Sequence, residues 1–395
     1  MSGTILGTIL ETRLKLSDLA PDAVQSEIRA MTVACAAANG INMAQGVCDT
    51  DPPAPVVEAA IQAIRDGFNI YTRLNGIESL RTAIAAKMAS FNGLPVNPET
   101  EVLVTSGTTG GMHAACMALL NPGDEVIVLE PFYGYHLNTL ESMRVRPVVV
   151  SLAGPEWALD ERALRQAVTP RTRAIVLNSP GNPSGKIFSR AELEQIAEIA
   201  VAADLFVLTD EIYEYFVYEG SEHISIATLP GMRERTITLS GFSKTFSITG
   251  WRLGYLTADA KWMPSIGYFH DLLYVCAPSP LQHGAVTGLL SLPESYYKQM
   301  AGDHQKKREM LSAALVDAGM PAAVPQGAYY MLADSSRIPG VNAKERARTL
   351  LRKTGVASVA GSAFFASGKG ETLLRFCFAK KDEELGEACR RLRAF

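Results

Sequence analysis

Short apolar runs recur along the middle of the chain and alternate with segments whose composition suits helices. The run EVLVTS at 101–106 is rich in β-branched residues, and the next apolar segment, GGMHAACMALL at 110–120, is compatible with a helix. The runs predicted to form strands are 101–106, 125–130, 146–152, 173–179, 205–211, 235–241 and 252–257. Ser189 and Glu192 form the S-x-x-E pattern of a capping box, which predicts a helix that ends near Ala202.

This alternation of strands and helices predicts the fold class. Strands that are nearly continuous apolar runs, separated by helical stretches, indicate an α/β protein with a mostly parallel central sheet flanked by helices. After about position 297 the chain instead carries a charged helical segment, an aromatic strand and a further helix and strand. We therefore expect a large domain over residues 51–296 and a smaller α+β domain formed by residues 1–50 and 297–395.

The composition narrows the classes of protein and partner. The 395 residues are 47% hydrophobic and 20% charged, which is typical of a globular protein rather than a disordered or fibrous one. Lys and Arg number 37 against 41 Asp and Glu, so no basic excess is available to follow a nucleic acid backbone. No apolar run approaches the ~18–20 residues of a membrane span. Because the stretch 1–16 lacks the pattern of a secretory signal, we expect a cytoplasmic protein that binds neither nucleic acid nor membrane.

The cysteines and histidines do not indicate a metal site. The six cysteines are widely scattered and form no C-x-x-C pair, which predicts reduced thiols rather than a zinc module or a disulfide framework. The histidines are His113, His136, His223, His270, His283 and His304. They have no metal-ligand spacing and are expected to be ordinary helix or surface residues, so we expect no bound metal.

Polar and glycine-rich residues follow several of the predicted strands. In an open parallel sheet, ligands lie beyond the carboxyl ends of the strands, so these positions are the candidates for chemistry. They are Gly107-Thr108-Thr109, Pro131-Phe132-Tyr133, the GNPSG loop at 181–185, Asp210 to Tyr213, and Ser243-Lys244. We expect all five loops to line one crevice.

Two of these loops have a functional and an ordinary interpretation. Gly107, Thr108 and Thr109 open a helix directly after a strand, so their backbone N–H groups and the helix dipole favour a phosphate; a tight turn with nothing bound is the alternative. Lys244 directly follows an apolar strand. It is either a solvated loop residue or an amine nucleophile whose pKa is lowered by nearby cations or by exclusion of water.

Asp210 and Arg375 are charged residues within or at the end of apolar strands. Asp210 needs a partner, because an unpaired buried charge is costly. The partner is either a helix end or cation of the protein, or a protonated ring nitrogen, for which a contact at ~4 Å is worth about 4 kcal/mol at an effective dielectric constant near ~20. The planar guanidinium of Arg375 suits a carboxylate, supplied by the protein or by a substrate.

Three motifs together resemble those of a known family. They are N-S-P-G-N-P-S-G at 178–185, D-E-I-Y at 210–213 and S-K-T-F-S-I-T-G-W-R-L-G-Y at 243–255. In this order they resemble the class I/II aminotransferases of fold type I, in the aspartate aminotransferase superfamily, and the matching motifs extend from about Asn42 to Ala379. The resemblance implies a pyridoxal 5'-phosphate-dependent enzyme. It would transfer an amino group between an L-amino acid and a 2-oxo acid by a ping-pong mechanism.

The resemblance also implies roles for individual residues around the cofactor ring. Lys244 would bind the cofactor covalently and later shuttle a proton, and Asp210 would pair with the ring nitrogen. Tyr213 and Asn182 would contact the phenolic oxygen of the ring, and Asn182 would also contact the substrate carboxylate. Tyr133 would stack on the ring face.

Further residues would hold the cofactor phosphate and the substrate. The cofactor phosphate would be held by the loop Gly107-Thr108-Thr109 together with Ser243 and Arg252. Tyr71 resembles the tyrosine that reaches the phosphate of the neighbouring subunit, which implies a homodimer. Gly46 would lend a backbone contact near the substrate, and Arg375 would bind the substrate's α-carboxylate.

The sequence leaves the substrate and one phosphate contact open. Many family members carry serine at the position of Gly241, so this chain is expected to have one phosphate contact fewer. No second arginine can be placed opposite Arg375, which favours neutral or aromatic amino acids over aspartate. Four aromatic residues either line a pocket for these side chains or belong to the core, the latter being more common for such residues: Tyr133, Tyr329, Phe364 and Phe365. The competing functions are a carbon–sulfur β-lyase on the same scaffold and a ligand-sensing regulator, for which the chain offers no DNA-binding appendage.

Overall fold

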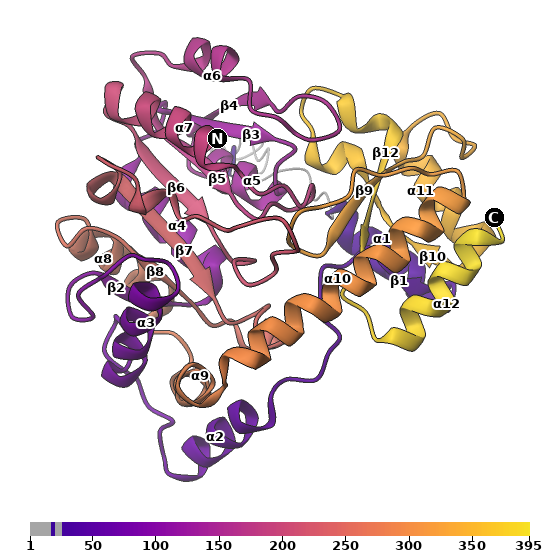
Figure 1. The fold of residues 1–395 in the computed structure, drawn as a ribbon. Helices are drawn as coiled ribbons and strands as arrows, with labels where there is room; N and C mark the ends of the chain where they lie inside the picture. Colours follow the sequence, from indigo (N-terminus) through magenta and orange to yellow (C-terminus); the bar gives the residue numbers. More distant parts are fainter. Residues whose placement is uncertain (1–16, 20–25) are drawn as a thin grey trace, which may run out of the picture.

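A seven-stranded sheet forms the centre of the larger part of the molecule, on the left of Figure 1. The computed structural model describes residues 17–19 and 26–395. The strands lie in the order β2-β8-β7-β6-β5-β3-β4, and neighbours are parallel except that β8 is antiparallel to β2 and β7. Their bounds are β2 Val102–Thr105, β3 Glu125–Glu130, β4 Arg146–Ser151, β5 Thr172–Asn178, β6 Phe206–Asp210, β7 Thr236–Gly241 and β8 Gly254–Thr257.

Helices cover both faces of this sheet, because its central strands present apolar side chains in both directions. In β3, Val126 and Val128 join the core under α4, α5 and α8, whereas Ile127 and Leu129 join a second core under α6 and α7. A third apolar cluster lies between the β2–β8 edge and the helices α2, α3 and α9. The helices of this part are α2 Ala54–Arg65, α3 Glu78–Ser90, α4 Gly107–Leu119, α5 Gly134–Ser142, α6 Glu161–Ala167, α7 Arg190–Ala202, α8 Met263–Tyr274 and α9 Ser279–Ser291.

The smaller part, on the right of Figure 1, is built on two small sheets. One is antiparallel, in the order β11-β12-β9, and the other pairs β1 with β10 in parallel. The strands are β1 Ile41–Asn42, β9 Tyr330–Asp334, β10 Val356–Ala357, β11 Val359–Ala360 and β12 Leu373–Cys377, and the helices are α1 Glu27–Ala37, α10 Glu294–Asp317, α11 Ala343–Thr354 and α12 Asp382–Arg393. The 3-10 turns within the described residues are Ile226–Thr228, Arg233–Arg235, Thr249–Trp251, Gly361–Phe364 and Lys369–Thr372.

The predicted fold class is confirmed, since the central sheet is mostly parallel and flanked by helices, and a strand overlaps each predicted run. The predicted capping box is also present: Ser189 accepts from the backbone N–H of Glu192, whose side chain accepts from the N–H of Ser189, and α7 ends at Ala202. We retain the division at 50/51 and 296/297 as a proposal. The 24-residue helix α10 passes the second boundary without a break and joins the two parts.

No helix in the part of the chain that the structure describes is long and apolar enough to cross a membrane. All six cysteines are free thiols, and five of them are buried, as expected for reduced cysteines. The stretch 1–16, on which the expected lack of an export signal rests, lies outside the described residues.

Candidate active site

A cavity of about 720 Å³ opens at the carboxyl ends of the central strands. It is lined by residues of all five predicted loops, and also by residues of α1 and of the smaller part. The predicted site residues that line it are Gly46, Thr108, Thr109, Tyr133, Asn182, Asp210, Tyr213, Ser243, Lys244, Arg252 and Arg375. Parallel strands that are joined by crossover helices end at the same edge of the sheet, so the loops that follow these strands lie together.

Lys244 follows β7 and is partly buried. Its Nζ donates a hydrogen bond to the carbonyl oxygen of Gly46 at 3.2 Å. Burial is the largest influence on this ammonium group, and together with the nearby Arg252 it lowers the pKa of Lys244 to about 8, against the opposing effects of Cys377, Cys48 and Asp210. The amine is therefore much more readily deprotonated than that of an ordinary lysine, as a nucleophile requires.

Asp210 ends β6, and two neighbours fix its carboxylate. His136 Nε2 lies 3.0 Å from Oδ2, and the backbone N–H of Ile212 donates to Oδ1 at 3.2 Å. His136 is buried in the first turn of α5, and its ring meets that of Tyr133 edge-on, with centroids 5.5 Å apart. The expectation of an ordinary histidine missed this contact. Its position three residues after Tyr133, in the helix that follows a strand end, is the available sequence signal.

An anion-binding corner forms where α4 begins. Gly107 has a φ of 71°, and a Cβ on it would lie 2.6 Å from Arg252 Nη2, so only glycine allows the arginine this approach. The N-cap residue Ser106 makes no side-chain capping bond, which leaves N–H groups of the first turn for a ligand. Arg252 itself has a left-handed backbone with φ 54°, and Thr108 and Ser243 line the cavity beside it. Donors and positive charge of this kind fit a phosphate group.

Gly241, the departure from the family pattern, sits opposite Gly254 in the β7–β8 pair. A Cβ on Gly241 would lie 2.8 Å from Gly254 Cα and 3.1 Å from the carbonyl oxygen of Leu253. The two strands are thus too close here for any side chain. The close approach of β7 and β8 explains why position 241 is glycine in this chain and cannot be serine.

The tyrosines of the cavity form a connected group. The hydroxyls of Tyr213 and Tyr330 are 2.8 Å apart, and burial raises the pKa of both phenols, that of Tyr330 to about 12. A Cβ on Gly46 would lie 1.8 Å from the Tyr330 oxygen, so glycine is required there. Tyr330 was not predicted. Of the four aromatic residues that were weighed between a side-chain pocket and the core, Tyr133 lines the cavity, whereas Tyr329, Phe364 and Phe365 are buried in the core of the smaller part.

Arg375 lies on β12 and is fully buried. Its Nη1 donates to Asn182 Oδ1 at 2.9 Å and its Nη2 to the carbonyl oxygen of Ala44 at 2.5 Å. Its guanidinium lies over the rings of Tyr330 and Phe364, at 4.5 and 4.7 Å from their centroids. The Nε is buried without a hydrogen-bond partner among the described residues, and none of its contacts there is a carboxylate. A buried guanidinium with an unused donor fits an incoming carboxylate.

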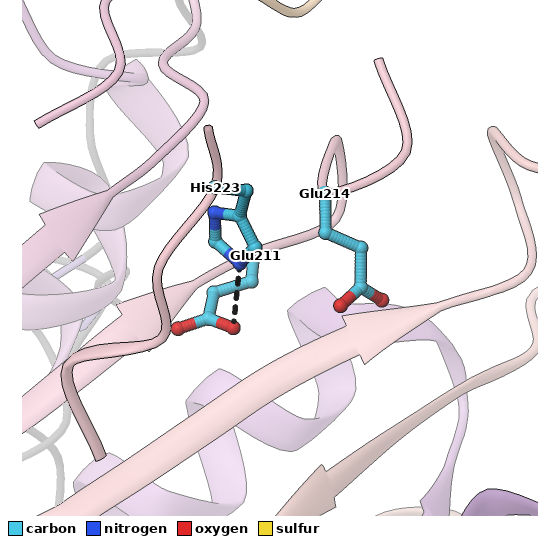
Figure 2. Close-up of side chains that lie close together, drawn as sticks. All are labelled: Glu211, Glu214 and His223. Atoms are coloured by element: carbon cyan, nitrogen blue, oxygen red, sulfur yellow. Dashed lines mark hydrogen bonds and ion pairs between the residues drawn. The ribbon is translucent and has the colours of Figure 1, made fainter. Parts of the chain in front are cut away.

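A second acidic group lies behind the Asp210–Tyr213 segment. Figure 2 shows Glu211 paired with His223, with Glu214 beside them; one ligand atom of each lies within 4.8 Å of the others, close enough to hold a metal ion. The carboxylates already have protein partners. Those of Glu211 are His223 and Ser225, and those of Glu214 are Lys87 at 2.5 Å, Ser240 at 2.6 Å and Asn92 at 2.8 Å. Burial opposes ionisation of Glu214, but Lys87 and these hydrogen bonds keep its pKa below the ordinary value. We conclude that this cluster anchors the segment.

Tyr71 is the one predicted site residue that lies elsewhere. Its side chain is 78% exposed and borders a surface groove with Ile70 and His283. Tyr71 is not among the described residues that line this chain's own cavity. Its predicted role therefore depends on a second subunit.

Comparison with known proteins gives consistent matches over most of the chain. The family model described as aminotransferase class I and II matches residues 38–392. The chain is 38% identical to a probable N-succinyldiaminopimelate aminotransferase of Mycobacterium tuberculosis, over 89% of this chain and 91% of that protein. It is 34% identical to an aromatic-amino-acid aminotransferase of Thermococcus litoralis, over 96% and 97%. The solved structure of the M. tuberculosis N-succinyldiaminopimelate aminotransferase superposes with a TM-score of 0.92 at 37% identity, covering 96% of this chain and all of that one.

Proposed function

Because the chain belongs to the class I and II aminotransferases, which depend on pyridoxal 5'-phosphate, we propose that it moves an amino group from a neutral or aromatic L-amino acid to a 2-oxo acid by a ping-pong reaction. The observation that carries this proposal is the Lys244 amine. Its pKa is lowered to about 8, and it shares one cavity with the carboxylate of Asp210 and the guanidinium of Arg375. These are an amine nucleophile, an anion for a ring nitrogen and a cation for an α-carboxylate.

The cavity residues fit the cofactor. When bound, pyridoxal 5'-phosphate supplies an aldehyde that condenses with amines and a ring that accepts electrons. The α4 N-terminus with Gly107, Thr108, Thr109, Ser243 and Arg252 would hold the phosphate. Tyr133 would stack on the ring, and Asn182 and Tyr213 would donate to its phenolic oxygen. Asp210, oriented by His136, would keep the ring nitrogen protonated.

The same residues would position the substrate and move its proton. Arg375 and Asn182, already hydrogen-bonded to each other, would hold the α-carboxylate, with the backbone of Gly46 alongside. The Nζ of Lys244, as a neutral amine, would take the proton from the substrate Cα and hold it as an ammonium group until the bound cofactor accepts it. A pKa of about 8 lets the amine act in both directions near neutral pH.

Two observations support a neutral or aromatic donor. The rings of Tyr133, Tyr135 and Tyr330 line the cavity and offer apolar and π contacts to a side chain. The relative from Thermococcus litoralis is named as an aromatic-amino-acid aminotransferase. Both fit the preference expected from the sequence.

The experiment that tests this function measures the two half-reactions separately. Purified holoenzyme is mixed with single amino acids, and the absorbance of the cofactor is followed; aromatic and neutral donors should convert the cofactor to its amino form with release of one 2-oxo acid. A second 2-oxo acid, such as 2-oxoglutarate or pyruvate, should restore the original spectrum. Continuous release of ammonia and pyruvate from an amino acid alone would contradict transamination.

We further propose a cytoplasmic homodimer in which Tyr71 reaches the neighbouring cavity. Exposed apolar side chains occur on α2, α8 and α9, including Ile64, Leu272 and Leu290, and Leu290 borders the same surface groove as Tyr71. Such a surface is typical of a subunit interface. Light scattering of the purified protein measures the mass, and fractionation of the source cells measures the location.

A further inference from the structure

A buried histidine of α8 contacts the turn that opens α4. The backbone N–H of Ser106, the N-cap residue of α4, donates a hydrogen bond to Nε2 of His270 at 3.1 Å. His270 is fully buried and does not line the cavity. The contact therefore joins two segments that are far apart in the sequence, at the residue that directly precedes Gly107.

This hydrogen bond fixes the protonation of the imidazole ring. Because Nε2 accepts, it carries a lone pair, and the proton of the neutral ring is on Nδ1. Burial, against an opposing effect of Asp271, lowers the pKa of His270 to about 4, so the ring stays neutral at neutral pH. An uncharged acceptor suits this position, since a carboxylate would repel a phosphate bound at the same turn and a lysine or arginine could not accept.

The packing of α8 on α4 holds the His270 ring in place. The ring of Tyr274, one turn later in α8, lies 5.2 Å from that of His270, measured between centroids. A Cβ on Gly110 would lie 3.1 Å from Tyr274 Cε2, so the glycine lets α8 approach α4 closely. Ile266, one turn before His270, is buried in the core that the two helices share. The imidazole is therefore held on both sides along its own helix.

Other protein groups hold the same turn. The hydroxyl of Thr105 donates to the carbonyl oxygen of Gly107 at 2.9 Å. Gly254 of β8 lies so near that an added Cβ would be 2.8 Å from the backbone nitrogen of Thr108. Together with His270, these contacts fix the backbone before and after Gly107. Donors that are held in one direction before a ligand binds are the more effective for it.

We propose that His270 is a positioning residue for the cofactor phosphate: by accepting the N–H of Ser106, it directs the N–H groups at the start of α4 toward that phosphate. This inference rests on the proposed function, in which the same turn holds the phosphate of pyridoxal 5'-phosphate. Loss of the acceptor would leave the N–H of Ser106 without its partner, and the turn would have to move to find another. Binding of the phosphate should then weaken, whereas binding of the aldehyde and the ring should not.

The test compares pyridoxal 5'-phosphate with pyridoxal, which has the same aldehyde and ring but no phosphate. Absorbance titration of the full-chain apoenzyme gives the Kd of each. In His270→Leu we expect the Kd of pyridoxal 5'-phosphate to rise ~10-fold and that of pyridoxal to change by less than ~2-fold, as for one lost hydrogen bond. Inorganic phosphate should also compete less strongly with pyridoxal 5'-phosphate. His270→Gln, whose side-chain oxygen can accept from Ser106, should recover most of the loss.

The matched control is Ile266→Ala, one turn earlier on the same helix. It removes buried apolar atoms and no hydrogen bond, so it should lower the Tm and leave the ratio of the two Kd values unchanged. An equal change of this ratio in Ile266→Ala and His270→Leu, or a wild-type ratio in His270→Leu, would overturn the role of His270. Equal affinity of the wild-type enzyme for the two compounds would instead refute the phosphate site of the proposed function.

A measurement on the wild-type enzyme tests the hydrogen bond even if His270→Leu does not fold. In NMR spectra of enzyme with isotope-labelled histidine, the signals that His270→Gln lacks belong to His270. Between about pH 6 and 8 they should be those of a neutral ring with its proton on Nδ1. A charged ring, or a proton on Nε2, would overturn the proposal.

Discussion

Three charged groups in the cavity are each held by a residue from a distant part of the chain. Lys244 is hydrogen-bonded to the carbonyl oxygen of Gly46, Asp210 to the ring of His136, and Arg375 to the side chain of Asn182. These hydrogen bonds orient the amine, the carboxylate and the guanidinium, so the three groups keep a set orientation before any ligand binds.

The lowered pKa of Lys244 gives a pH prediction. Only the neutral amine attacks an aldehyde, and its fraction rises with pH, so the rate of covalent cofactor binding to the apoenzyme should rise with a midpoint near the pKa of about 8. A lysine with an ordinary pKa would hold ~100-fold less neutral amine at pH 8. Stopped-flow absorbance between pH 6 and 9.5 measures this rate. A rate that keeps rising tenfold per pH unit up to 9.5 would contradict the prediction. The control is Lys244→Ala, whose fold is checked by circular dichroism; it should show neither covalent binding of the cofactor nor turnover.

His136 should act through Asp210. The change His136→Asn removes the hydrogen bond at 3.0 Å, and we expect kcat to fall about tenfold while the fold is kept. Asp210→Ala should lose far more activity and also bind pyridoxal phosphate weakly. The matched control is His113→Asn on α4, which does not line the cavity and should leave kcat unchanged. An equal fall in kcat for His136→Asn and His113→Asn would contradict the proposed role of His136.

Among the elements, β8 is the most tightly constrained. A Cβ on Gly254 would lie 2.8 Å from the backbone nitrogen of Thr108 and 3.1 Å from the carbonyl oxygen of Ser240. The glycine therefore lets β8 meet the first turn of α4 and β7 at once. The phosphate corner depends on this close approach.

Gly254→Ala should accordingly destabilise the protein and weaken cofactor binding together. Overpacking of this kind costs ~1–3 kcal/mol, and we expect a lower Tm and a higher Kd for pyridoxal phosphate. Gly302→Ala is the control: it lies in α10, where an added Cβ meets nothing within 4 Å, and it should raise the stability slightly. Unchanged cofactor affinity in Gly254→Ala would show that the α4 turn tolerates the displacement.

The elements themselves could be predicted from local sequence. β3 spans the apolar run 125–130, and the capping box at Ser189 gave the start of α7, because both depend on neighbours along the chain. The contacts of His136 and Tyr330 could not be predicted in this way. Each meets the site only after segments far apart in the sequence have packed, so neither spacing nor periodicity carries the information.

For the molecule as a whole, subunit exchange tests the homodimer. Lys244→Ala lacks the amine, and Tyr71→Ala lacks only the contact to the neighbouring subunit. If Tyr71 acts across the interface, a mixed dimer holds one intact site, and refolding the two variants together should restore about a quarter of the wild-type activity. Activity in the mixture that equals the average of the two separate variants would show that Tyr71 serves its own chain.

The continuous helix α10 also acts as a rigid lever. Its 24 residues span about 36 Å, so a rotation of ~5° at the end near α9 displaces the other end by ~3 Å. That displacement is comparable to the length of a hydrogen bond. Because Lys307 of α10 donates a hydrogen bond to the carbonyl oxygen of Lys380, a small angular change of this rod would be felt directly after β12, the strand that carries Arg375.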